Sequence, residues 1–391
     1  MSMSPPLTPP TAFRGVDVPP FYTNHIAQRA AELREQGRAI IPMHFGAPTA
    51  GTPPAVRQAA ALALADDPNG YVESRELIER ISSHYRDAYQ LEVAPSRIQL
   101  TAGASAGLVA AFAALFHPGD SIAVGRPGYP AYRNAMQALG RRTVEIDLDA
   151  ASGYQLTGAH LDAVPDPLHG LLVASPANPT GAMLDTAGLD ALATRCRARA
   201  ITLISDEIYH GISYGERAIC ALEVDDNAIV INSFSKLFRM PGWRLGWMVV
   251  PEVLAPRLSA YVINCFLTPP ALAQRAALAA FDDPAELAAA VDVYRVNRHF
   301  LLTELSAAGI AGIVAPQGAF YLYLDVAHLT DDSLSFCLRL LEDTGVAAAP
   351  GLDFDPIGGH GSMRLSFAVS AGEAARAAVL LRDWFALQPR R

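Results

Sequence analysis

The alternation of short apolar runs with longer Ala- and Leu-rich stretches constrains the fold of this chain more than any other feature. Between about residues 55 and 265, runs rich in β-branched residues alternate with stretches of helical period. This pattern is typical of a mostly parallel sheet with helices on both faces, and it predicts an α/β fold. The expected strands span residues 97–101, 121–125, 143–148, 170–175, 201–205 and 228–233.

The sequence changes in character after Pro270, which indicates a second, smaller domain. A helical block rich in Ala, Leu and Arg runs to about Ala308, and "GAFYLYLDV" and "SMRLSFAVS" then alternate as half-buried strands do. The chain is also longer than one hydrophobic core usually supports. We therefore predict an N-terminal arm over residues 1–20, a large domain over 51–270, and a small α+β domain formed by 21–50 and 271–391.

Composition and charge favour a small-molecule partner in a reducing compartment. The net charge is −9, the sequence pI is near 5.6, and no basic block is present, so nucleic acid and anionic membranes are not expected partners. The four cysteines are far apart and form no CxxC pair, which argues against a metal site or a disulfide framework. No apolar segment is long enough to span a bilayer, and the first residues lack the order of a secretion signal. We expect a cytoplasmic protein.

Ligands of parallel sheets bind outside the carboxyl ends of the strands, so the residues that follow each expected strand are the first candidates for a site. "AGASAGLVAAF" leaves the N–H groups of Ala104 and Ser105 free for a phosphate, although a tight packing turn explains this segment equally well. Tyr129 in "RPGYPAY" suits a planar ligand, or packs on the sheet edge. Asn178 in "PANPTG" offers a rigidly held amide, or only an Asn-Pro turn.

The last two strands deliver a carboxylate and an amine. Asp206 follows "ITLIS", where a buried carboxylate is costly without a cation such as a protonated pyridine nitrogen, unless it only caps a helix. Lys236 follows "AIVINS" in an apolar stretch, where desolvation is expected to lower its pKa and free a nucleophilic amine for a Schiff base. Ser233, Ser235 and Arg244 suit the oxygens of a dianion. Together, these features describe a pyridoxal phosphate site.

Five segments resemble, in order, the fold-type I aminotransferases of class I and II, close to the subgroup of bacterial aspartate and aromatic aminotransferases. They are "ASPANPTGAML", "SDEIYHG", "SFSKLFRMPGWRLGW", "GVAAAPG" and "MRLSFA". The resemblance covers the chain from about Arg14 to Trp384. It implies a pyridoxal-phosphate-dependent transferase that moves the amino group of an L-amino acid to a 2-oxo acid by a ping-pong mechanism. It also implies a homodimer with active sites at the subunit interface.

The resemblance assigns a role to each motif residue. Lys236 forms the Schiff base and then shuttles a proton, Asp206 keeps the ring nitrogen protonated, and Tyr129 stacks on the ring. Tyr209 and Asn178 bond the phenolic oxygen of the ring. The remaining residues bind anionic groups: the phosphate is held by Ala104, Ser105, Ser233, Ser235, Arg244 and, across the dimer, Tyr71; the substrate carboxylate is held by Arg364, Asn178 and Gly46. The segment around Tyr71, "NGYVESRELIERI", is shorter than in the family.

The sequence leaves the reaction and the substrate partly open. The same cofactor supports β-elimination at a C–S bond and other carbanion chemistry, and a non-catalytic regulator on this fold is a remote alternative. The substrate side chain is bound either by a distal arginine or by an apolar pocket. The candidate residues are Arg14, Arg75 and Arg126 for the first case, and Phe21, Tyr22 and Phe320 for the second.

Overall fold

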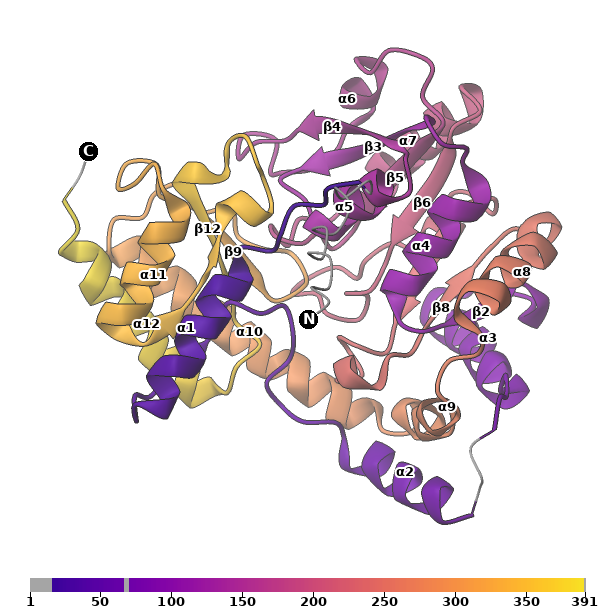
Figure 1. Ribbon diagram of the computed structural model, residues 1–391, viewed down its shortest axis with the longest axis horizontal. Coiled ribbons are helices and arrows are strands. Elements are labelled where there is room, and N and C mark those ends of the chain that lie inside the picture. Colours follow the sequence, from indigo (N-terminus) through magenta and orange to yellow (C-terminus); the bar gives the residue numbers. More distant parts are fainter. Residues whose placement is uncertain (1–15, 67–69, 390–391) are drawn as a thin grey trace, which may run out of the picture.

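The large sheet of the computed structural model confirms the predicted α/β fold. The structure describes residues 16–66 and 70–389, so Arg14 and most of the expected N-terminal arm lie outside the described residues. Seven strands form one sheet in the order β2-β8-β7-β6-β5-β3-β4, with helices on both faces (Figure 1). All strand pairs in this sheet are parallel except the two that β8 makes with β2 and β7.

All six expected strands are present, and their bounds differ from the prediction by at most one residue. They are β2 (Ile98–Thr101), β3 (Ser121–Arg126), β4 (Arg142–Asp147), β5 (Gly170–Ala174), β6 (Thr202–Asp206) and β7 (Ile229–Ser233). The seventh strand, β8 (Gly246–Val249), was not predicted from the sequence. Its four residues are all buried, so they carry none of the polar alternation that marks a half-exposed strand.

Alternate residues of each strand point to opposite faces of the sheet and reach different helices. Ile122 and Val124 of β3 pack with α4 (Ala104–Leu115), α5 (Pro130–Ala138) and α8 (Ala255–Phe266). Ala123, on the other face, belongs to a core that includes α3 (Arg75–Tyr89), α6 (Gly158–Asp162) and α7 (Thr186–Ala198). Both faces are therefore covered, and the carboxyl ends of β3, β5, β6 and β7 meet at one edge of the sheet.

The rest of the chain builds a smaller unit beside that edge (Figure 1). Its three-stranded antiparallel sheet has the order β11-β12-β9, from Ala349–Pro350, Ser362–Ser366 and Tyr321–Asp325. The helices are α1 (Thr23–Glu35), α10 (Pro284–Ala307), α11 (Ser333–Thr344) and α12 (Ala371–Ala386). The short strand β1 (Ile41–Pro42) pairs in parallel with β10 (Val346–Ala347), which ties the N-terminal segment to this unit.

The packing of α9 (Ala271–Leu278) bears on where the two units divide. Ala273, Ala276 and Ala277 share the core of the large sheet, and α9 lies against α2 (Pro54–Asp66) and α3. We therefore propose that the boundary follows α9, rather than preceding it at Pro270. In the described part of the chain, no helix is long and apolar enough to cross a membrane.

Candidate active site

A cavity of about 390 Å³ lies at the edge of the large sheet, where the smaller unit covers the strand ends. Its wall contains all but one of the site residues that the sequence nominates. These are Gly46, Ala104, Ser105, Tyr129, Asn178, Asp206, Tyr209, Ser233, Ser235, Lys236, Arg244 and Arg364. The exception is Tyr71, which is 85% exposed and does not line the cavity within this chain.

Lys236 stands three residues beyond the end of β7, and its amine points into this cavity. Its Nζ donates a hydrogen bond to the carbonyl oxygen of Gly46 at 2.5 Å and lies 5.7 Å from the centre of the Tyr209 ring. Burial and the positive charge of Arg364 lower the pKa of Lys236 to about 8, against the opposing effect of Asp206. Lys236 is also the only lysine in the 391-residue chain, so no other side chain supplies a primary amine.

We expect covalent capture of added pyridoxal phosphate by the cofactor-free protein to accelerate as the pH rises through about 8. Because only the free amine attacks an aldehyde, the reactive fraction of Lys236 grows through its pKa and then levels off. Borohydride reduction at fixed times, followed by mass measurement, gives the rate at each pH. A midpoint near the ordinary lysine value of 10.5 would show that the cavity leaves the amine unperturbed.

Asp206 is the last residue of β6, and its carboxylate is 2% exposed. The hydroxyl of Tyr132 donates to Oδ2 at 2.6 Å, and the N–H of Ile208 donates to Oδ1 at 3.2 Å. Burial raises the pKa of Asp206 to about 6, while these two donors and Lys236 oppose the shift. The carboxylate is therefore mostly ionised at neutral pH and suits a cationic ring nitrogen.

An anion site forms where α4 begins, next to Arg244. Gly103 precedes the helix with φ +81°, and a Cβ there would lie 2.5 Å from Nη2 of Arg244. Glycine is required for both the backbone angle and the close approach of the guanidinium. Ser233 donates to the hydroxyl of Ser235 at 2.9 Å on the same wall. Helix N–H groups, two hydroxyls and a guanidinium fit a phosphate dianion.

Arg364, on β12, is 4% exposed and forms the cationic wall opposite the sheet. Its Nη1 donates to Oδ1 of Asn178 at 2.9 Å, and its Nη2 donates to the carbonyl of His44 at 2.6 Å. The guanidinium lies 4.4 Å from the centre of the Tyr321 ring and 4.7 Å from that of Phe354. Among the described residues its buried Nε has no partner, so the guanidinium keeps a donor for a carboxylate ligand.

Several residues that line the active-site cavity were not identified as site residues from the sequence. Tyr132, on α5, donates to Asp206. It lies three residues after Tyr129, the N-cap of that helix, and both residues line the cavity. The hydroxyls of Tyr321 and Tyr209 are hydrogen-bonded at 2.5 Å. On β9, Tyr321 lies on the same face as Tyr323, the residue that pairs with Arg364 on β12. Both spacings were present in the sequence, but their partners come from distant segments.

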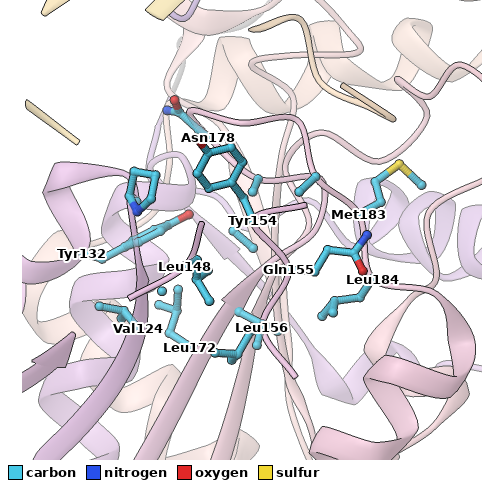
Figure 2. Close-up of a pocket in the computed structure, with 17 residues that line it drawn as sticks. Val124, Tyr132, Leu148, Tyr154, Gln155, Leu156, Leu172, Asn178, Met183 and Leu184 are labelled. Carbon is cyan, nitrogen blue, oxygen red and sulfur yellow. The ribbon is translucent and has the colours of Figure 1, made fainter. Parts of the chain in front are cut away.

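A second, apolar pocket of about 50 Å³ lies behind Tyr132 and Asn178, which line both cavities. Figure 2 shows these two side chains together with Val124, Leu148, Leu156 and other largely aliphatic residues. Such a surface offers few hydrogen-bond partners to the amide of Asn178. The amide is therefore directed by Arg364, on the side of the active-site cavity.

Amine, buried carboxylate, anion site and arginine wall together define a pyridoxal-phosphate-dependent enzyme of fold type I. The family model described as Aminotransferase class I and II matches residues 38–381, and the chain belongs to this family. It therefore transfers amino groups between amino acids and 2-oxo acids and uses pyridoxal phosphate, as the resemblance implied.

The relatives support transamination over elimination. A valine–pyruvate aminotransferase from Mycobacterium tuberculosis is 41% identical over 378 residues, which cover 95% of this chain and 97% of that protein. An aspartate/prephenate aminotransferase from Thermus thermophilus is 32% identical and covers 90% of this chain and 92% of that protein. The crystal structure of an aminotransferase from Mycobacterium tuberculosis has a TM-score of 0.94 at 41% identity, and the match covers 97% of this chain and 100% of that one.

Proposed function

We propose that this aminotransferase takes the amino group of an L-amino acid with an uncharged aliphatic side chain, such as valine, and passes it to pyruvate. The proposal rests on the number of cationic side chains in the cavity wall and on the task that each of them has. Among the described residues of the wall, the cationic side chains are Lys236, Arg244 and Arg364. Each has a task in the proposed chemistry, so none remains for a second carboxylate on the substrate.

Of the arginines considered for a distal carboxylate, Arg14 lies outside the described residues, and Arg75 and Arg126 do not line the cavity. Arg75 has a side chain that is 91% exposed and pairs with Glu79, while Arg126 pairs with Asp147 and Asp355. His44, which does line the cavity, has its pKa lowered to about 4 by burial and is neutral at pH 7. A substrate with a charged end would leave that charge without a partner.

An apolar pocket is the better supported alternative. Phe21, Phe45 and Phe354 line the cavity, whereas Phe320 is fully buried in the core of the smaller unit. Tyr22 contributes its backbone N–H to the carboxylate of Asp353 at 2.6 Å. The name of the relative from Mycobacterium tuberculosis agrees with an aliphatic donor and pyruvate as acceptor.

A half-reaction screen tests this preference. The purified, cofactor-loaded enzyme is mixed with single amino acids, and conversion of the cofactor to its amine form is followed by absorbance. We expect L-valine to react on the order of 10²-fold faster, as kcat/KM, than L-aspartate or L-glutamate, because the acidic side chains lose hydration without gaining a cation. L-Alanine serves as the control that carries neither bulk nor charge. Faster conversion with L-aspartate than with L-valine would contradict the proposal.

Each site residue has a proposed task once the cofactor is in place. Pyridoxal phosphate supplies an aldehyde that captures amines and a ring that accepts the electron pair of the substrate Cα. Arg364 and Asn178, which are hydrogen-bonded to each other in the cavity wall, would bind and orient the substrate carboxylate. Lys236, with a pKa near 8, takes that proton at Nζ and returns it to another carbon. Asp206 holds a proton on the ring nitrogen.

The other cavity residues bind and position the cofactor. Tyr129 would cover one face of the ring, and Tyr209 and Asn178 would donate to its phenolic oxygen. Gly46 assists at the substrate carboxylate through its N–H. The phosphate is bound by Ala104, Ser105, Ser233, Ser235 and Arg244.

We also propose a homodimer in which the partner subunit completes the cavity. Phe45 lines the cavity yet is 47% exposed, and Tyr71 is 85% exposed, so both rings lack the cover that a partner would give. Tyr71 of one subunit would then bond the phosphate in the other. Tyr71→Phe is expected to weaken cofactor retention on the order of 10-fold through loss of one hydrogen bond to a charged group. A monomer in sedimentation velocity, or unchanged retention, would contradict this.

A cytoplasmic location belongs to the same proposal. The cysteines at positions 196, 220, 265 and 337 are free thiols, and three of them are buried. Free thiols are typical of reducing compartments. Recovery of the protein in an exported fraction, rather than with cytoplasmic markers, would contradict it.

A further inference from the structure

His210 follows Tyr209 directly, and its imidazole is 5% exposed. Both ring nitrogens have partners: Nε2 lies 2.9 Å from the carbonyl oxygen of Ser175, and Nδ1 lies 2.9 Å from the hydroxyl of Tyr89. Because a carbonyl only accepts, Nε2 carries the hydrogen. Burial lowers the pKa of His210 to about 3, so the ring is neutral and Nδ1 accepts from Tyr89.

The imidazole therefore connects two strand ends of the large sheet. Ser175 is the first residue after β5 and precedes Asn178 by three positions, while His210 lies in the turn after β6. The hydroxyl of Ser175 accepts the N–H of Leu184 at 2.9 Å, which closes the far side of the same turn. His210 thus holds the segment that carries Asn178 against the segment that carries Tyr209.

A carboxylate and a guanidinium also lie near the His210 imidazole. Oε2 of Glu207 lies 3.4 Å from Nδ1 and, within the described part of the chain, is buried without a hydrogen-bond partner, whereas Oε1 accepts from the hydroxyl of Ser205 and the N–H of Ala221. Tyr89 ends α3, and the guanidinium of Arg217 lies 5.4 Å from its ring centre, which keeps positive charge near the imidazole. The tautomer of the neutral ring is set by the Ser175 carbonyl, which holds the hydrogen on Nε2.

We propose that His210 is a positioning residue of the amino-transfer reaction. Through the carbonyl of Ser175 it fixes the spacing between Asn178 and Tyr209, the two side chains that donate to the phenolic oxygen of the cofactor. This inference rests on the proposed roles of Asn178 and Tyr209. Without the imidazole, the turn after β5 is free to move away from the turn after β6, and the phenolic oxygen loses the aligned amide donor.

The experiment measures the pH at which the resting, cofactor-loaded enzyme changes between its protonated and unprotonated absorbance bands. Donors to the phenolic oxygen stabilise its anionic form and compete with the neighbouring imine proton. His210→Phe is expected to raise this midpoint by about half to one pH unit. His210→Gln, whose amide N–H still reaches towards a carbonyl, is expected to restore part of the shift. kcat is expected to fall about 10-fold, with little change in KM.

His84→Phe is the matched control. The His84 imidazole packs edge-on against the same Tyr89 ring, with centroids 6.0 Å apart, but among the described residues it has no hydrogen bond to Ser175. Its replacement is expected to leave the midpoint in place. Equal shifts in His84→Phe and His210→Phe, or no shift in a folded His210→Phe variant, would overturn the proposal.

A folding defect in His210→Phe is covered by a second variant. Tyr89→Phe removes only the hydroxyl that donates to Nδ1, and a smaller upward shift of the midpoint is expected. No shift in a folded Tyr89→Phe variant would also overturn the proposal. Failure of the proposed donor roles is recognised separately, because Tyr209→Phe would then leave the midpoint unchanged. Failure of the substrate assignment shows only in the half-reaction screen, since the midpoint is measured before any amino acid is added.

Discussion

Lys236→Ala is expected to abolish amino transfer while leaving a folded protein that still binds pyridoxal phosphate. The variant loses both the amine that captures the cofactor and the base that moves the Cα proton, so turnover should fall by more than about 10⁴-fold. The anion site at α4 and the carboxylate of Asp206 are untouched, so non-covalent binding persists. The measurement is a coupled assay for the oxo-acid product, together with dialysis and absorbance to follow retained cofactor.

Arg257→Lys provides the control for the selectivity with which the cavity places the cofactor on Lys236. It places a second lysine on the exposed side of α8, and borohydride treatment of the loaded variant is expected to label only Lys236, as in the wild-type protein. Turnover of Lys236→Ala within about 10-fold of wild type would remove the lysine from the mechanism. Labelling of the new surface lysine would show that the cavity does not select the amine.

Asp206→Asn is expected to lower the rate of the half-reaction by about 10³-fold with little change in folding. The amide has the size of the carboxylate and keeps an oxygen for the hydroxyl of Tyr132, but it has no negative charge to hold a proton on the ring nitrogen. The electron pair from the substrate Cα is then accepted less readily. Single-turnover absorbance with a saturating amino acid measures this step without product release.

Tyr132→Phe separates charge from geometry at the same site. It removes the 2.6 Å hydrogen bond to Asp206 and keeps the carboxylate, so the rate of the half-reaction is expected to fall only about 10-fold. The missing donor should also raise the pKa of Asp206, because the Tyr132 hydroxyl lowers it in the native protein. The carboxylate is then protonated at a higher pH, and activity is lost earlier on the acid side. Equal losses in both variants would mean that Asp206 acts by position alone.

The site residues at the strand ends of the large sheet were predictable because they stand at or just after apolar runs of the sequence, whereas Arg364, inside β12, was assigned only through the family resemblance. Asp206 and Lys236 were found in this way, and the α/β fold was confirmed with them. Strand β8 escaped prediction because it is only four residues long and contains a single β-branched residue, Val249. The site predictions for the motif residues agree with a shared cavity, while their roles stay proposals.

What the sequence could not give is the pairing between distant segments. The Tyr132 to Asp206 hydrogen bond spans 74 positions, and the Arg364 to Asn178 hydrogen bond spans 186. Only the folded sheet and the docked smaller unit bring these groups together. The packing of α9 was unpredictable for the same reason. Its alanines allow a close approach to another helix, but the sequence does not indicate that α2 and α3 are the partners.

A chain of 391 residues with one lysine has an unusual surface chemistry. Its positive charge is carried almost wholly by guanidinium groups, which do not condense with aldehydes under ordinary conditions. Reactive carbonyl compounds therefore meet a single side-chain amine, and that amine lies within the cavity beside Gly46. A simple monoaldehyde probe therefore reports on the catalytic position with no background from other lysine side chains.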